Sequence, residues 1–273
     1  MPAQVKTMQE WEESGVHGLL SVVIPAHNEE GHISDTVRTL AGRLAEAGIE
    51  HEILVVNDNS SDGTEEALRM LVTELATVCY VNNTVPNSFG WAVRRGLAAF
   101  RGDAVAVVMA DGSDDPADVV KFYRKLQDGY DCVFGSRFCK GGTCYHYPWP
   151  KLILNRIGNL LIRTLFWMSY NDVTNAFKMY RRHVIAGLYP LLAHHFNLTV
   201  ELPLKAIVRG YSYAVVPNSW YNRESGVSKF KIREMGSRYL FIILYCFLEK
   251  MLVGHDYKDL TTVRGYQLQV WPK

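Results

Sequence analysis

The chain has 273 residues, of which 48% are hydrophobic and 21% are charged, and its formal net charge is +1. This length and composition allow one sizeable globular core, and the near-neutral charge excludes a global electrostatic field of the kind that attracts nucleic acid. The five cysteines are odd in number and include no CxxC pair, which predicts a reduced, cytoplasmic protein without a zinc site.

The first half of the chain alternates short apolar runs with amphipathic segments. The apolar runs, several of them rich in valine and isoleucine, predict buried strands at Leu19–Ile24, Ile53–Val56, Val78–Val81, Ala104–Val108 and Cys132–Phe134. Apolar residues at helical spacing predict helices between them, at Ile33–Ala47, Thr64–Leu75, Ser88–Phe100 and Ala117–Gln127. Strands that alternate with helices indicate an α/β fold, a doubly wound and mostly parallel sheet with helices on both faces.

The second half is less regular. Its pattern predicts a flexible loop at Gly141–Thr143, a strand at Tyr211–Val216, and helices at Lys151–Phe166, near Thr199–Val208 and at Ile232–Val253. The last of these helices is amphipathic. No repeat or low-complexity tract divides the chain, so we expect one domain over residues 1–253 and a short tail over 254–273.

Three polar loops follow predicted strands: PAHNEE at 25–30, NDNSSDGT at 57–64 and MADGSDDP at 109–116. Asn, Asp, Ser and Gly form turns, so each loop taken alone has an ordinary interpretation as a solvated turn. Because ligands bind at the carboxyl ends of the strands in such sheets, all three loops are expected to converge on one crevice. Asp111 with Asp114 or Asp115 could supply the carboxylates that Mg²⁺ uses beside phosphate oxygens.

Other nucleotide chemistries fit poorly. The sequence has no GxGxxG after its first predicted strand and no GxxxxGK[ST], which disfavours Rossmann cofactors and P-loop NTPases. It also has no HExxH and no GxSxG, which disfavours a zinc protease and a serine hydrolase.

The order and spacing of six short motifs resemble a known family. SVVIPAHNEE, ILVVNDNSSDGT, VVMADGSDDP and VFGSRF resemble the family 2 inverting glycosyltransferases, which have the GT-A fold. NDVTNAFKMYRR and NRESGVSKFK are similar to the polyprenol-phosphate sugar transferases, the dolichol-phosphate mannose synthase group. The resemblance covers roughly residues 19 to 253. It implies transfer of a mannose or glucose type of sugar from a GDP- or UDP-sugar to polyprenyl or dolichyl phosphate, with inversion and with Mg²⁺ or Mn²⁺.

The resemblance assigns the donor side of the site. It implies that the nucleoside is bound by residues of the first loop and the end of the second strand, namely Pro25, Ala26, Asn28, Glu29 and Asp58. Asp111 and Asp114 are the implied metal ligands and catalytic carboxylates, and Asp172 and Asn175 the implied sugar contacts. Two motifs depart from the family pattern: Asn57-Asp58 replaces a tandem Asp, and the Asp-x-Asp is shifted within Ala110–Asp115. Asp115 is expected to cap the next helix.

A phosphate acceptor would need cations rather than a general base, because its second pKa is about 6. Matching positions supply basic side chains and one hydroxyl: Arg137, which is also a catalytic candidate, Arg156, Arg223, Ser228 and Lys229, with Lys151 as a further candidate. Arginine binds phosphate oxygens bidentately, and lysine adds a point charge. The ordinary interpretation of each is solvated surface charge.

Two other functions stay open. The same fold could use a hydroxyl acceptor on a glycan, a lipid or a small metabolite, with Asp172 or Asp115 as the base. The altered acidic motif also leaves room for a catalytically weak binding subunit.

The longest apolar run, Tyr239–Leu248, is too short for a membrane span, which needs about 20 residues. It lies in the predicted helix Ile232–Val253. That helix is expected either to pack on the sheet or on a second subunit of a homodimer, or to enter the membrane interface. We therefore expect a cytoplasmic protein. Peripheral contact with the cytoplasmic face of a membrane is one alternative for it.

Overall fold

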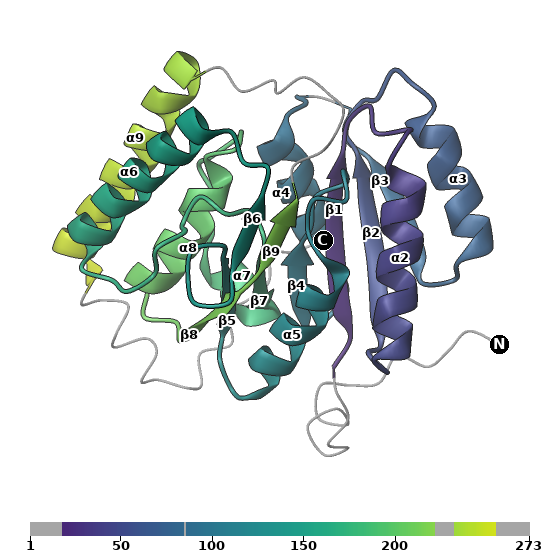
Figure 1. Cartoon of the computed structure of the whole chain (residues 1–273), viewed down its shortest axis with the longest axis horizontal. Coiled ribbons are helices and arrows are strands. Elements are labelled where there is room, and N and C mark those ends of the chain that lie inside the picture. The colour runs from purple at the N-terminus through teal and green to yellow at the C-terminus, as the bar shows by residue number, and fades with distance from the viewer. Residues whose placement is uncertain (1–17, 85, 222–231, 255–273) are drawn as a thin grey trace.

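A seven-stranded sheet runs through the molecule (Figure 1). The structure, a computed structural model, describes residues 18–84, 86–221 and 232–254. The strand order is β3 (Val78–Asn82), β2 (His51–Asn57), β1 (Leu20–Ala26), β4 (Ala104–Val107), β7 (Lys178–Arg181), β5 (Cys132–Ser136) and β8 (Tyr213–Pro217). All neighbouring pairs are parallel except those of β7, which is antiparallel to both β4 and β5. The predicted α/β, mostly parallel sheet is confirmed.

Helices cover both faces of the sheet, and each face has its own apolar core. One core is formed with α2 (Ile33–Glu46), α3 (Thr64–Glu74) and α5 (Pro116–Gln127). The other is formed with α4 (Phe89–Ala99), α7 (Arg182–Gly187) and α8 (Leu198–Val208). Because both faces are covered, every residue of β1 and β2 is buried, which explains their continuous runs of valine, isoleucine and leucine. The predicted strands and helices of the first half are confirmed to within a few residues.

The strand β7 was not predicted. It pairs Val107 of β4 with Lys178, so it begins beside the carboxyl end of β4. The loop that precedes it, residues 171–177, therefore opens at the same edge of the sheet as the loops that follow the parallel strands. An antiparallel insertion thus brings a segment from the second half of the chain to the edge where ligands bind.

A second, two-stranded parallel sheet joins β6 (Thr143–Tyr145) to β9 (Ser219–Tyr221). The expectation of a flexible loop at Gly141–Thr143 is wrong at its last residue, because Thr143 pairs with Ser219. The rings of Tyr145 and Tyr221 stack with centroids 4.7 Å apart, which adds to this pairing.

The helices α6 (Trp149–Phe166) and α9 (Ile232–Leu252) lie side by side at one end of the molecule (Figure 1). A buried ion pair holds α9 on α8: the Nε atom of Arg209 donates to Oε1 of Glu249 at 2.7 Å, and both side chains are at least nine-tenths buried. No helix within residues 18–84, 86–221 and 232–254 is long and apolar enough to cross a membrane.

We expect Glu249→Ala to lower the free energy of unfolding by about 3 kcal/mol, because it leaves the Arg209 guanidinium buried without its carboxylate. Urea unfolding followed by circular dichroism measures the change. The matched control is Glu74→Ala, which removes an exposed ion pair with Arg38 and should leave the midpoint unchanged. Equal effects of the two substitutions would contradict the role of the buried pair.

Candidate active site

The first two polar loops are joined at the carboxyl edge of the sheet. The backbone N–H of Ser61 donates to Oδ1 of Asn28 at 2.8 Å, and the N–H of Asn28 donates to Ser60 Oγ at 3.0 Å. The N–H of Glu29 donates to Thr64 Oγ1 at 2.8 Å. Asn28 has a φ of 56°, a left-handed conformation that asparagine tolerates better than most residues. The predicted convergence of these two loops is confirmed.

Asp58 lies directly after β2 and is buried. Its backbone N–H donates to the carbonyl of Ala26, at the end of β1, at 2.7 Å. Asn83 donates from Nδ2 to Oδ1 of Asp58 at 2.6 Å. Burial raises the pKa of Asp58, and the hydrogen bond from Asn83 opposes that rise. Nothing in the sequence pattern pointed to Asn83, which reaches Asp58 only because β3 lies beside β2.

The three aspartates of the acidic loop have different surroundings. Asp115 accepts a hydrogen bond from the N–H of Ala117 at 2.8 Å, which confirms that it caps α5. Asp114 is buried, and its Oδ2 accepts from the N–H of Met109 at 3.1 Å. Burial, and to a lesser extent the charge of Asp111, raise the pKa of Asp114 to about 7 despite that hydrogen bond.

These residues fit a divalent cation bound together with a diphosphate. Among the described residues no group of three or more His, Cys, Asp and Glu side chains could hold a metal ion by itself. A magnesium ion that also binds phosphate oxygens needs only one or two carboxylates from the protein. A cation beside Asp111 and Asp114 would offset both causes of the raised pKa of Asp114.

A cavity of about 230 Å³ lies between α2 and the acidic loop and is lined by both carboxylates. It is lined by His32, Asp35, Thr36, Thr39, Leu40, Val108, Asp111, Gly112, Asp114 and Pro116. Thr36 also fixes the loop, because its hydroxyl donates to the carbonyl of Ala110 at 3.0 Å. The cavity is smaller than the pocket of a typical drug-sized ligand, so a nucleotide would extend beyond it.

The strand β9 meets the acidic loop. Trp220 forms an antiparallel bridge with Asp114, and the N–H of Tyr221 donates to the carbonyl of Ser113 at 3.0 Å. The segment that begins one residue later contains Arg223, Ser228 and Lys229, and these three residues lie outside the described part of the chain.

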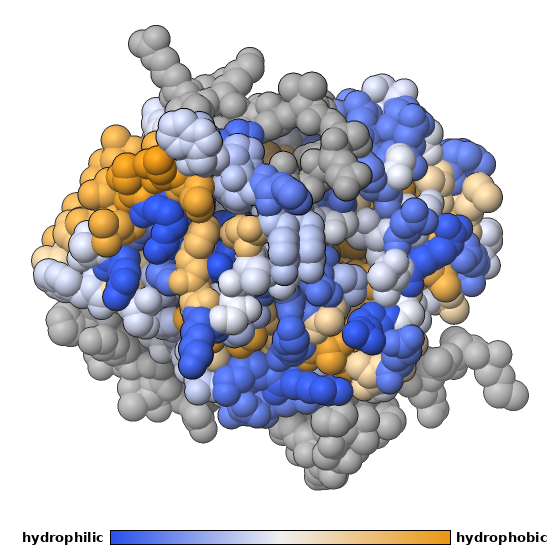
Figure 2. Space-filling view, in the orientation of Figure 1, coloured by the Kyte–Doolittle hydropathy of each residue, from blue (hydrophilic) through white to orange (hydrophobic). Residues whose placement is uncertain are grey.

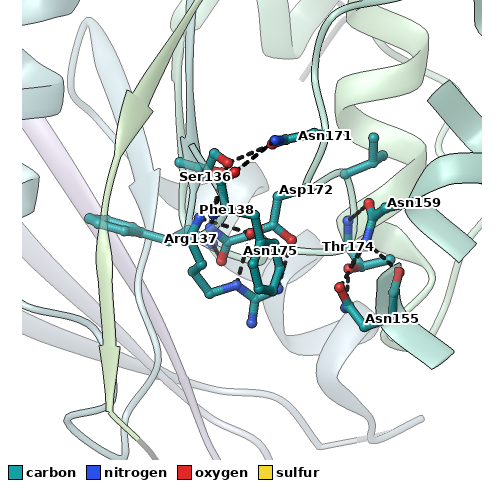
Figure 3. A network of polar contacts seen from close by, with 12 residues as sticks. Ser136, Arg137, Phe138, Asn155, Asn159, Asn171, Asp172, Thr174 and Asn175 are labelled. Atoms are coloured by element: carbon teal, nitrogen blue, oxygen red, sulfur yellow. Dashed lines mark hydrogen bonds and ion pairs between the residues drawn. The ribbon is translucent and has the colours of Figure 1, made fainter. Parts of the chain in front are cut away.

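Arg137 and Asp172 form a buried ion pair (Figure 3). The Nε atom of Arg137 donates to Oδ2 of Asp172 and its Nη2 atom donates to Oδ1, both at 2.8 Å. The backbone N–H of Arg137 also donates to Oδ2, at 3.0 Å. Burial alone would lower the pKa of Arg137, but Asp172 outweighs it and raises the pKa. The sequence assigned these two residues to different substrates, whereas the structure pairs them with each other.

The polar side of α6 holds the loop that contains Asp172 (Figure 3). Asn155 and Asn159 donate from Nδ2 to Thr174 Oγ1 at 2.7 and 3.0 Å. Arg156 donates to the carbonyl of Asn171 at 3.2 Å. The guanidinium of Arg156 also lies 4.4 Å from the centre of the Phe138 ring, which follows Arg137 in the chain. The Arg137 guanidinium lies 5.4 Å from the centre of the same ring, so two of the predicted phosphate-binding arginines contact one phenylalanine.

Asn175 and Lys178 complete this side of the site. Asn175 donates from Nδ2 to the Gly135 carbonyl and to Asn218 Oδ1, both at 3.0 Å. Lys178 is buried and donates to the backbone carbonyls of Val173, Asn175 and Thr199. Burial lowers the pKa of Lys178 to about 7. The sequence analysis missed Lys178, because a lysine beside two arginines in FKMYRR reads as surface charge.

Comparison with known proteins gives a family and a fold. The model of the family described as glycosyl transferase family 2 matches residues 21–188. A polyprenol monophosphomannose synthase of Mycolicibacterium smegmatis is 31% identical over 239 residues, which are 80% of this chain and 86% of that protein. A dolichol-phosphate mannosyltransferase of Pyrococcus furiosus is 28% identical over 216 residues, which are 78% of this chain but 59% of that longer protein.

Solved structures share the fold at low sequence identity. A glucosyl-3-phosphoglycerate synthase of Mycobacterium tuberculosis, in complex with Mn²⁺, UDP and phosphoglyceric acid, superposes with a TM-score of 0.62 at 19% identity. The match covers 91% of this chain and 84% of that one. It confirms the predicted GT-A architecture, and at this identity it carries the fold alone.

We expect Asp111→Ala to weaken Mn²⁺-dependent binding of a nucleoside diphosphate at least about tenfold, because it removes one of the two acidic-loop carboxylates that face the cavity. Calorimetry with GDP and with UDP, each with and without Mn²⁺, measures the effect. Asp115→Ala is the control: it removes a helix cap, so it should cost about 1 kcal/mol of stability and leave binding nearly unchanged. Full affinity in Asp111→Ala would overturn the assignment of Asp111 as a metal ligand.

Proposed function

The chain belongs to glycosyl transferase family 2, and we propose that it transfers a mannosyl residue from a nucleotide-sugar donor to polyprenyl or dolichyl phosphate, with inversion. The names of the two relatives support this acceptor, and they favour mannose over the glucose that the sequence left open. The donor is a GDP- or a UDP-sugar.

The observation that carries the choice of acceptor is the Arg137–Asp172 pair. A hydroxyl acceptor needs a general base, and the sequence offered Asp172 and Asp115 for that role. Both oxygens of Asp172 accept hydrogen bonds from Arg137, and Asp115 caps α5. Protonation of Asp172 would remove the negative charge that pairs with the buried Arg137 guanidinium, and protonation of Asp115 would remove the charge that favours the start of α5. A phosphate monoester is already ionised near neutral pH and needs no base.

Basic side chains for that phosphate gather on the same side. Arg137 and Arg156 both lie against the Phe138 ring. We include Arg223, Ser228 and Lys229 in the acceptor site, since their segment starts directly after Tyr221, which is hydrogen-bonded to the acidic loop. In this proposal Arg137 is oriented by Asp172 and contacts the acceptor or the charge that develops during transfer.

The donor is proposed to lie across the joined loops. Pro25, Ala26, Asn28, Glu29 and Asp58 would contact the nucleoside, and Asp111 and Asp114 would hold Mg²⁺ or Mn²⁺ against the diphosphate. When bound, the metal ion stabilises negative charge on the leaving diphosphate. Asp172 and Asn175 are proposed to lie near the sugar of the donor. Asp172 fixes Arg137 by accepting its hydrogen bond, and Asn175 fixes the carbonyl of Gly135 by donating to it.

The proposed reaction is a single displacement. An oxygen of the lipid phosphate forms a bond to the anomeric carbon as the bond from that carbon to the nucleoside diphosphate breaks on the opposite face. Attack from opposite the leaving group inverts the anomeric centre. Holding two anions in line supplies much of the rate enhancement, and fixed positive charge supplies the rest. Since the acceptor lipid resides in a bilayer, we place the protein at the cytoplasmic face of a membrane.

The direct test offers the full-length protein GDP-mannose or UDP-glucose, Mn²⁺, and either a polyprenyl phosphate or the matching unphosphorylated alcohol. We expect mannose on the phosphate and a rate at least about a hundredfold lower with the alcohol, which lacks an ionised oxygen. Transfer to the alcohol at a similar rate would favour the hydroxyl-acceptor function. Donor binding without transfer to either would favour a binding subunit.

A second prediction concerns Arg156. Arg156→Ala should raise KM for a water-soluble, short-chain prenyl phosphate about tenfold and leave nucleotide affinity unchanged, because it removes a cation from the acceptor side alone. Arg163→Ala alters another exposed arginine of α6, about two turns further along the helix, and is the matched control that should change neither value. Arg223→Ala and Lys229→Ala are expected to resemble Arg156→Ala. Normal acceptor kinetics in all three would remove the basis for a phosphate acceptor.

A further inference from the structure

The two-stranded sheet of β6 and β9 has two different faces. It lies near the centre of the view in Figure 1, between α6 and α5, and the surface over it in Figure 2 is mostly of intermediate hydropathy. Side chains alternate along a strand, so the paired residues Cys144 and Trp220 lie on one face, and Tyr145 and Tyr221 lie on the other. Tyr145 and Tyr221 are 45% and 43% exposed, whereas Trp220 is half-buried. The Trp220 face is therefore the one that turns toward the fold.

The Trp220 face lies near the charged groups of the site. Burial raises the pKa of the Cys144 thiol, while the charges of Arg137 and Asp172 shift it in opposite directions, so the thiol lies near their ion pair. The ring of Trp220 contacts the ring of Tyr147, with centroids 5.0 Å apart. The guanidinium of Arg137 lies 5.7 Å from the centre of the Tyr147 ring. One aromatic pair thus joins the small sheet to the proposed acceptor cation.

The other end of this aromatic pair lies at the acidic loop. The backbone of Trp220 forms a bridge with Asp114, and the residue before it donates its N–H to Oδ2 of the buried Asp118 at 2.7 Å. Burial raises the pKa of Asp114, and the charge of Arg137 acts in the opposite direction, so these two charged groups are close enough to interact. The rings of Trp220 and Tyr147 therefore span a short distance between the proposed metal carboxylate and the proposed acceptor cation.

The backbone on both sides of Tyr147 is restricted. His146, before it, has a φ of 55°, a left-handed conformation that most residues avoid. Pro148, after it, has a φ fixed by its own ring and is the residue at which α6 begins. A half-buried ring between two such residues is largely ordered before a ligand arrives, which lowers the entropic cost of a contact with it.

We propose that the rings of Trp220 and Tyr147 form the wall against which the transferred hexose packs. In the proposed reaction the sugar lies between the donor diphosphate and the acceptor phosphate, and the two rings connect those two ends of the site. A hexose has C–H groups on its faces and hydroxyls at its rim, so an aromatic wall complements its faces. Packing there would hold the anomeric carbon in line with the attacking oxygen. The inference rests on the proposed function and adds to it residues that recognise the sugar.

The test compares a sugar nucleotide with its own nucleoside diphosphate and needs no acceptor. Calorimetry with Mn²⁺ gives the dissociation constants of GDP-mannose and GDP, and of UDP-glucose and UDP, for the full-length protein. Within the pair that binds more tightly, the ratio of the two constants measures the contribution of the hexose. We expect Trp220→Leu and Tyr147→Leu each to lower that ratio at least about fivefold, because leucine removes the aromatic face. The affinity for the nucleoside diphosphate should stay within about twofold.

Matched variants make the result specific to the aromatic wall. Trp220→Phe and Tyr147→Phe retain a ring and should retain most of the ratio. Tyr145→Leu removes a ring of the same small sheet from its opposite face and should bind both ligands as the wild type does. A general loss of stability would weaken both ligands alike and leave the ratio unchanged. Circular dichroism melting confirms that each variant is folded.

Three outcomes would overturn the inference. They are a wild type that binds the sugar nucleotide no more tightly than the nucleoside diphosphate, leucine variants that keep the wild-type ratio, and a Tyr145→Leu variant that lowers it equally. Transfer to a polyprenyl phosphate is assayed in parallel. A lowered ratio in a protein that does not use this acceptor would retain the aromatic wall and reject the proposed acceptor. Transfer by the wild type with an unchanged ratio in the leucine variants would do the reverse.

Discussion

The arrangement of the proposed acceptor side depends on the buried contact between Arg137 and Asp172. It links the end of β5 to the loop before β7, two segments that are 35 residues apart in the chain. Burying two charges is costly, and the cost is offset here by two side-chain hydrogen bonds and one from the backbone. The antiparallel insertion of β7 makes the contact reachable, because it turns the 171–177 loop toward the carboxyl edge. The result is a cation whose position is fixed before any substrate arrives.

The acidic half of the site has the opposite electrostatic character. Asp114 is buried near the charge of Asp111, and its pKa is about 7 because burial and this like charge both disfavour the ionised carboxylate. Since this pKa lies above the ordinary value of 3.8, proton binding by Asp114 stabilises the folded protein as the pH falls from about 7 to about 3.8. A cation bound at higher pH would take the place of that proton. One half of the site is thus neutralised by the fold, and in the proposed function the other half would be neutralised by a divalent ion bound with the donor.

Sequence patterns predicted the parts of the molecule that depend on local periodicity. The valine-rich strands, the helices between them and the Asp115 cap all follow from neighbouring residues. The strand β7 was missed because four residues with a lysine at one end and an arginine at the other carry too little pattern. The pairing of Arg137 with Asp172 was missed for another reason: polar partners far apart in sequence leave no periodic signal. Family resemblance proposed roles for both residues without indicating that they touch.

In α6 the choice of buried and exposed residues does not follow the hydropathy of the side chains. In an ordinary surface helix the apolar stripe faces the core and the polar stripe faces water. In α6 the polar Asn159 is buried against Thr174, while Ile157 and Leu161 are exposed. Asparagine is disfavoured inside helices, so its place here is explained by the loop that it holds. The inward face of α6 combines this polar contact with the buried apolar side chains of Ile162 and Phe166, so one face of the helix both packs on the core and holds the loop of Asp172.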